Sequence, residues 1–179
     1  MKRTLLSLTL PLAISALLLS VVQAPVNWAF LAWVAMTPFA LACRPNIRVR
    51  TLVIFAWLVG TAHWLANIYW IAPITILGWL AMGVYVAALW PLLALGIRRA
   101  RMWNVPMALA LPILVVGAER LQGFPLGGFY WRLLGHSQYA NLTFIQISDL
   151  FGVAGVSFLV AAVNGVLADW SLWWISNRR

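Results

Sequence analysis

The sequence carries very little charge and almost no chemistry-bearing side chains. Of its 179 residues 8% are charged, three are acidic and one is a cysteine. Soluble domains carry about 25% charged residues, and a chain of this size cannot enclose so much apolar surface, so a water-soluble domain is excluded. One cysteine excludes an intrachain disulfide and a cysteine-based metal cluster. The two histidines, His63 and His136, are too few for a conventional zinc site, so we expect neither a metal nor another cofactor.

What the chain has instead is long apolar runs. It is 64% hydrophobic, with a mean hydropathy of +0.93. Crossing a hydrocarbon core takes about 17 to 25 mostly apolar residues, and six segments meet that length. We therefore expect an all-α polytopic membrane protein, with residues 1–179 forming a single transmembrane helical domain and one long extracytoplasmic loop at 119–149. The expected spans are 4–22, 26–43, 51–71, 76–97, 102–118 and 150–168.

The basic residues stand at the ends of these runs and predict the orientation. Cytoplasmic connections of membrane proteins collect Lys and Arg. With six spans, all basic residues but Arg120 and Arg132 fall on one side. Both termini are therefore expected in the cytoplasm. Because the net charge of +9 is not gathered on one solvated face, nucleic acid is not an expected partner.

The first span has an alternative interpretation as a signal peptide. Lys2 and Arg3 precede an apolar stretch that ends in small residues around Ala24. The apolar run is longer than the about 7 to 15 residues of a usual signal peptide, and Pro25 would follow the cleavage point. Both features favour a helix that stays in place.

One face of the third expected span carries polar side chains. Gly60, His63 and Asn67 recur at helical spacing, so that they share a face that should point into the bundle. Polar groups inside a membrane usually form hydrogen bonds between helices or line a cavity. Helix packing is the expected role here, and contact with a substrate is the alternative.

The sixth expected span carries a stripe of small residues. Ser157, Ala161 and Gly165 follow one another at intervals of four, with Asn164 beside them. Such a stripe allows close approach of another helix and a hydrogen bond to it, so helix packing is expected. The neighbouring helix could belong to this chain or to another copy. Further along, Asp169 is expected at the inner interface, solvated or paired with a nearby arginine.

The expected outer loop contains the polar stretch GFYWRLLGHSQY, which is unlike the rest of the chain. A tryptophan there suits the headgroup region, and an arginine can bind phosphate. Glu119, the first residue of this loop, could form ion pairs with nearby cations or contact a charged headgroup. The residues expected to face lipid or substrate are Glu119, Arg120, Trp131, Arg132, His136 and Gln138.

Residues 119–164 hold a series of short motifs in a fixed order across a loop and two helix ends. The motifs are Glu119-Arg120, Gly123-Phe124-Pro125, Leu134-Gly135-His136-Ser137-Gln138, Ile145-Gln146-Ile147-Ser148-Asp149-Leu150, Gly152, Gly155, Val156-Ser157-Phe158-Leu159 and Asn164. This series resembles the membrane half of the bacterial apolipoprotein N-acyltransferases, and the resemblance implies a location in the bacterial inner membrane. Earlier stretches are less similar to that family, and they are Asn27-Trp28, Trp33, Pro38, Gly60, Trp64 and Trp70-Ile71.

The resemblance implies an enzyme that moves an acyl chain from a phospholipid to the free amine of a diacylglyceryl-lipoprotein. In that family an extracytoplasmic nitrilase-like domain holds a Glu-Lys-Cys triad, in which a thiolate takes the acyl chain. This sequence ends at Arg179, where the family would continue, so no catalytic residue is assigned and the chain alone is expected to be inactive. Membrane phospholipid, a diacylglyceryl-lipoprotein and a separate nitrilase-like domain are the expected partners.

Three alternatives remain open from the residues alone. The chain could bind lipid or lipoprotein without chemistry, or it could be one subunit of a split enzyme. A small transporter is the third, although no acidic residue lies in the middle of an expected span, where ion relays place one.

Overall fold

The computed structural model describes residues 2–124 and 128–177, and every regular element in that part is a helix. The predicted all-α fold class is thus confirmed. The longer helices are α1 (Lys2–Val21), α4 (Val49–Asn67), α5 (Ile76–Ala87), α6 (Leu89–Met102), α7 (Met107–Gly123) and α8 (Ser148–Asn177). The short helices, with η for 3-10 geometry, are η1 (Ala29–Leu31), α2 (Ala32–Ala35), α3 (Thr37–Ala42), η2 (Tyr69–Ile71), η3 (Leu134–Gln138) and η4 (Phe144–Ile147).

Three helical stretches are long and apolar enough to cross a membrane: Val49–Asn67, Ile76–Met102 and Phe144–Asn177. They cover the third, fourth and sixth expected spans. Two shorter apolar helical stretches, Leu6–Val21 and Ala29–Ala42, lie within the first and second. The protein is therefore a helical membrane protein, and the count of six crossings stays a prediction.

The second expected span is broken into short helices rather than continuous. Pro38 lacks a backbone N–H and its ring clashes with the preceding turn, which interrupts the helix between α2 and α3. The side chain of Asn164 on α8 accepts hydrogen bonds from the backbone N–H groups of Met36 and Thr37, at 2.8 and 3.0 Å. The N–H of Phe39 donates to Ser15 Oγ on α1 at 2.8 Å. Side chains of neighbouring helices thus replace the hydrogen bonds that the break removes.

The fifth expected span is shifted along the chain. Its helix, α7, begins after Pro106 and runs to Gly123, so the expected loop at 119–149 starts too early. Asp169 of α8 explains the start of α7, because its carboxylate accepts from the N–H groups of Met107 and Ala108 at 2.9 and 3.0 Å. A carboxylate is favourable at a helix N-terminus. The expected nearby arginine is present, since Arg101 interacts electrostatically with Asp169, but the carboxylate's hydrogen bonds go to backbone.

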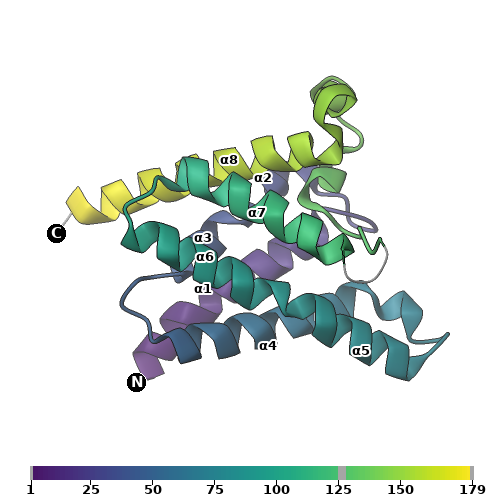
Figure 1. The fold of residues 1–179 in the computed structure, drawn as a ribbon, viewed down its shortest axis with the longest axis horizontal. Coiled ribbons are helices and arrows are strands. Elements are labelled where there is room, and N and C mark those ends of the chain that lie inside the picture. The colour runs from purple at the N-terminus through teal and green to yellow at the C-terminus, as the bar shows by residue number, and fades with distance from the viewer. Residues whose placement is uncertain (1, 125–127, 178–179) are drawn as a thin grey trace.

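The sixth expected span is the helix α8, and it is bent near its start. Gly152 has a φ of 62° and a ψ of −167°, outside the helical region, and glycine adopts such angles without the cost that a side chain would add. Figure 1 shows the segment before this bend turned away from the axis of α8. The bend places η4 and the first turn of α8 to one side of the bundle.

The long helices lie roughly side by side, and the bundle has two distinct ends (Figure 1). The start of α1 and the end of α8 lie at one end. The opposite end, here named the loop end, carries residues 128–147 and the α4–α5 connection at 68–75. Residues 119–123 of α7 also reach this end, so polar segments that are distant in sequence meet there.

Basic residues from separate connections meet at the end opposite the loop end. Arg98 Nη2 donates to the carbonyl of Pro45 at 2.7 Å, and Arg44 Nη2 donates to the carbonyl of Ser7 at 3.0 Å. The expected orientation requires these connections to share one side of the membrane. Their proximity agrees with that orientation, which stays a prediction.

Candidate functional site

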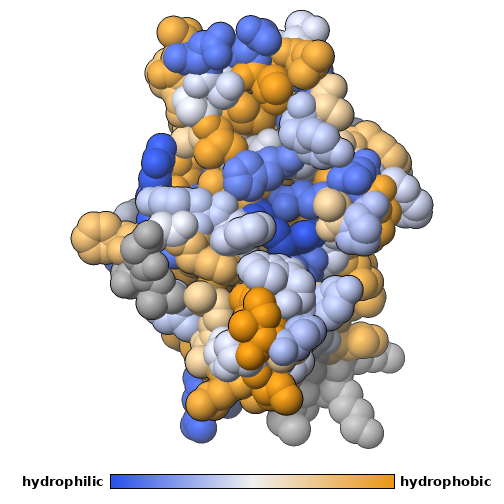
Figure 2. Space-filling view, turned by 90° about the vertical axis from the view of Figure 1, so that its right-hand side faces the viewer, coloured by the Kyte–Doolittle hydropathy of each residue, from blue (hydrophilic) through white to orange (hydrophobic). Residues whose placement is uncertain are grey.

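The loop end presents a polar face. Figure 2 looks onto it and shows hydrophilic side chains gathered around a hollow in its centre, with hydrophobic side chains above and below. In a membrane protein such a face meets headgroups, water or a domain outside the bilayer, because unpaired polar groups are costly in hydrocarbon.

Two long helices hold the start of η3 in place at this end. Glu119 Oε1 on α7 accepts from the backbone N–H of Leu134 at 2.6 Å, and Ser157 Oγ on α8 accepts from that of Gly135 at 2.8 Å. A Cβ atom on Gly135 would lie 2.7 Å from the carbonyl oxygen of Val153, closer than packing allows, so a glycine is needed here. The motif at Leu134-Gly135 is therefore in direct contact with the motifs at Glu119 and Ser157.

Arg132, which was expected to be available for phosphate, is engaged inside the protein. Its guanidinium donates to the carbonyls of Ala24, Leu19 and Ser20 at 3.2, 3.4 and 2.9 Å. Two of these carbonyls belong to the last turns of α1, where unpaired carbonyls favour a cation. Partial burial lowers the pKa of Arg132, but a guanidinium keeps its charge in proteins.

Amide side chains support the rest of the loop. Gln138, which was expected to face lipid, is only 3% exposed, and its Nε2 donates to the carbonyl of Ala29 at 2.9 Å. Gln122 on α7 donates to the carbonyls of Phe129 and Trp131 at 3.1 and 2.7 Å. Sequence reasoning missed Gln122, although an amide one turn after Glu119 at the end of an apolar helix is a usable signal.

Three of the expected residues line a hollow at the loop end, and a fourth lies outside it. Glu119, Arg120 and His136 meet in a hollow of about 250 Å³. The other residues that line it are Tyr130, Leu133, Val153 and Ala154. Arg120 and His136 are exposed, and partial burial lowers the pKa of His136, which favours the neutral imidazole. Trp131 lies outside this hollow, is 52% exposed and packs against Trp70 with ring centres 5.3 Å apart.

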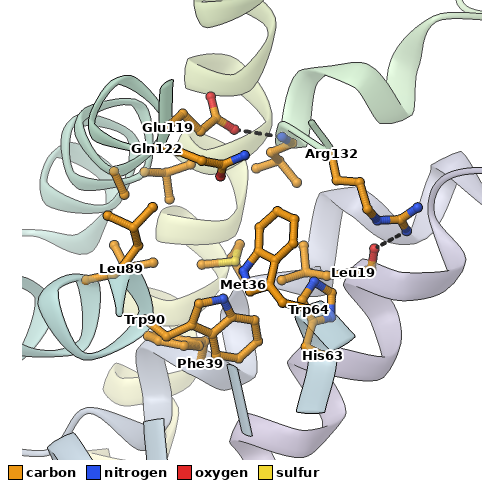
Figure 3. A pocket seen from close by; sticks show the side chains of 14 residues that line it. Leu19, Met36, Phe39, His63, Trp64, Leu89, Trp90, Glu119, Gln122 and Arg132 are labelled. Carbon is orange, nitrogen blue, oxygen red and sulfur yellow. Dashed lines mark hydrogen bonds between the residues drawn. The ribbon is translucent and has the colours of Figure 1, made fainter. Parts of the chain in front are cut away.

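A second cavity, of about 100 Å³, lies deeper in the bundle and is named here the central cavity (Figure 3). Aromatic and aliphatic side chains form most of its wall, and Glu119, Gln122 and Arg132 lie toward the loop end. The residues that line it are Leu19, Met36, Phe39, His63, Trp64, Leu89, Trp90, Leu93, Val115, Ala118, Glu119, Gln122, Arg132 and Leu134.

The polar face of α4 joins that helix to α1 beside the central cavity. His63 Nδ1 lies 3.1 Å from both the carbonyl oxygen of Ala16 and the hydroxyl of Ser20. Asn67 Nδ2 donates to the same hydroxyl at 2.8 Å. These residues link two helices, and His63 also lines the central cavity. Contact with a substrate stays a prediction.

The small residues of the expected packing faces lie against helices of the same chain. A Cβ atom on Gly60 would lie 2.6 Å from Cγ of Trp90 on α6. A Cβ atom on Gly165 would collide with the backbone carbonyl of Met107 on α7, and Ala161 is fully buried. In residues 2–124 and 128–177 no group of three or more His, Cys, Asp and Glu side chains could hold a metal ion.

The fold and the site define a class, which is an all-helical membrane protein with a hydrogen-bonded polar loop at one end. Within that class, residues 15–166 match the family model described as the apolipoprotein N-acyltransferase N-terminal domain. This match covers most of the sequence, and the chain belongs to that family. The predicted family is therefore confirmed.

Curated relatives agree with the family match. The chain is 35% identical over 150 residues to an apolipoprotein N-acyltransferase of Geobacter metallireducens, covering 76% of this chain and 28% of the relative. It is 26% identical over 178 residues to one of Rhodopirellula baltica, covering 84% of this chain and 31% of the relative. The chain thus spans only about a third or less of the length of these relatives.

Proposed function

We propose that this chain is the membrane-embedded part of an enzyme that transfers an acyl chain from a phospholipid to the free amine of a diacylglyceryl-lipoprotein. A nitrilase-like domain, on the same polypeptide or a separate one, performs the transfer. The 179 residues alone bind and orient lipid and do not catalyse.

The observation that carries this proposal is the construction of the loop end. The motifs at Glu119, Leu134-Gly135 and Ser157 are joined by hydrogen bonds of 2.6 and 2.8 Å. Gln138 and Arg132 fasten the same loop to η1 and α1. A loop bonded to several helices is a rigid platform, and rigid support is what a catalytic domain acting on membrane lipids needs.

The hollow at Glu119, Arg120 and His136 supplies the contact with a charged headgroup. Arg120 is exposed and cationic, and a guanidinium binds phosphate through paired hydrogen bonds. The exposed ring of Trp131 suits the headgroup region, where an aromatic ring with a polar edge is favoured. We place these residues outside the inner membrane, with six crossings and both termini in the cytoplasm.

The test is an assay of lipoprotein N-acylation with and without a nitrilase-like domain. The chain is expressed alone, or together with the catalytic domain of a relative, in cells depleted of their own enzyme. Mass spectrometry of the lipoprotein's N-terminal peptide reports the third acyl chain. We expect no acylation by the chain or the domain alone and clear acylation by both, and no gain from the combination would contradict the proposal.

A further inference from the structure

The central cavity contains a buried hydrogen-bond donor without an acceptor. Trp64 is 4% exposed, and its indole Nε1 has no hydrogen-bond partner among the described residues. An unpaired buried N–H costs free energy, and such groups usually have a partner. In Figure 3 the indole nitrogens of Trp64 and Trp90 are turned toward the same central space near Met36.

The other polar side chains that line the cavity make hydrogen bonds outside it. The carboxylate of Glu119 is turned to Leu134 N, and the amide nitrogen of Gln122 donates to two loop carbonyls. Arg132 donates to carbonyls around the end of α1, and His63 Nδ1 faces Ala16 O. Arg132 Nε also has no hydrogen-bond partner among the described residues, but in Figure 3 the guanidinium is turned toward Leu19, away from the space that the Trp64 indole faces. The unmet donor inside the cavity is therefore Trp64 Nε1–H, which a ligand with an acceptor oxygen would satisfy.

The size and the wall of the cavity restrict that ligand. A volume of about 100 Å³ corresponds to the liquid volume of roughly three water molecules, so it takes only the end of a long molecule. Its aliphatic and aromatic wall favours methylene groups. A buried water needs two to four polar partners, whereas a carbonyl oxygen is satisfied by one N–H.

We propose that the central cavity binds the carbonyl end of a lipid acyl chain, with Trp64 Nε1–H donating to the carbonyl oxygen. The first methylenes pack against the apolar wall, and the rest of the chain leaves between α6 and α7, where Leu89, Leu93 and Ala118 are only half-buried. The choice of an acyl lipid rests on the proposed function. A phospholipid ester and a free fatty acid both offer this chemistry.

The test follows the indole N–H of Trp64 by two-dimensional ¹H–¹⁵N spectroscopy of the protein in lipid nanodiscs. The variant Trp64→Phe keeps a ring in place and identifies the resonance, while Trp170→Phe, at an exposed position on α8, is the assignment control. Nanodiscs of diester phosphatidylglycerol are compared with nanodiscs of the diether analogue, which has the same headgroup and no carbonyl. A fatty acid is then titrated into the diether nanodiscs.

A downfield shift of the Trp64 resonance in diester but not diether lipid supports the inference and identifies an ester as the source. A saturable shift only on adding fatty acid supports it with the acid as the source. The inference is overturned if the Trp64 resonance has the same position in diester and diether nanodiscs and does not move when fatty acid is added to the diether nanodiscs.

A cavity-filling variant keeps the indole and removes the space. Ala118→Leu should abolish the shift or weaken binding at least tenfold, whereas Val116→Leu, on the same helix but outside the cavity lining, should leave it unchanged. An unchanged shift in Ala118→Leu would also overturn the inference. None of these measurements involves acyl transfer, so the inference and the proposed function can fail separately.

Discussion

Glu119 Oε1 accepts a hydrogen bond from the backbone N–H of Leu134 at 2.6 Å, which joins the last turns of α7 to the start of η3. The two residues belong to separate motifs of the family resemblance. Their contact indicates that Glu119 acts first as a support of the loop. Any contact of Glu119 with a headgroup has to use its other carboxylate oxygen or follow a change in this hydrogen bond.

Removing the carboxylate should loosen η3. Glu119→Ala leaves the buried N–H of Leu134 without its acceptor, and an unsatisfied buried donor costs about 1 to 3 kcal/mol. Amide hydrogen exchange of residues 134–138 in detergent should speed up by at least tenfold. Glu119→Gln keeps an acceptor oxygen, so its exchange rate should lie between those of the wild type and Glu119→Ala. Arg120→Ala changes an exposed neighbour and should leave the exchange rate unchanged. Equal exchange in the wild type and Glu119→Ala would show that this contact does not hold the loop.

Asn164 should stabilise the broken second segment. Asn164→Leu keeps the volume but leaves the N–H groups of Met36 and Thr37 without acceptors, at about 1 to 3 kcal/mol each. The midpoint of thermal unfolding in detergent should fall by several degrees. Asn46→Leu, on an exposed connection, is the control and should change it little. A stable Asn164→Leu protein would contradict the role given to this amide.

Two glycines that differ in their surroundings should respond differently to alanine. Gly135→Ala places a Cβ atom 2.7 Å from the carbonyl oxygen of Val153, and such overpacking costs about 1 to 3 kcal/mol. Gly117→Ala on α7 meets nothing within 4 Å and should be neutral or slightly stabilising, because alanine favours helix. Unfolding midpoints of both variants give the comparison, and equal effects would argue against the position of η3.

Cysteine labelling should report the orientation. Cys43 is buried and free, so Cys43→Ala provides a cysteine-free background. A cysteine at the exposed Asn141 should react with an impermeant maleimide added outside spheroplasts, and one at Asn46 should react only after the membrane is opened. The reverse pattern would overturn the proposed orientation.

The all-helical fold class could be predicted from the sequence, because long apolar runs and helical spacing are local features of the chain. Helical spacing puts Gly60, His63 and Gly165 on packing faces, and they lie against Trp90, α1 and α7 in the structure. Helix breaks were harder to place. The interruption at Pro38 is stabilised by Asn164, more than 100 residues away, and no local pattern shows such a partner.

The loop residues show the same limit for the candidate site. Arg132 and Gln138 have the chemistry of headgroup ligands, and the sequence offers no sign that both donate to backbone carbonyls inside the protein. Which face of a loop residue is buried depends on the helix ends it meets. Composition therefore identifies a polar loop end, while the division into supporting and exposed residues needs the three-dimensional arrangement.

A chimera in living cells tests most directly whether this chain is the membrane part of an N-acyltransferase. Residues 1–179 replace the matching N-terminal part of the Geobacter metallireducens relative, in a strain depleted of its own enzyme, and mass spectrometry measures N-acylation of a lipoprotein. We expect the chimera to restore most of the acylation and its Glu119→Ala form to restore at least fivefold less at equal protein level. A folded, membrane-inserted chimera that gives no acylation would contradict the claim that this chain is the working membrane part of such an enzyme.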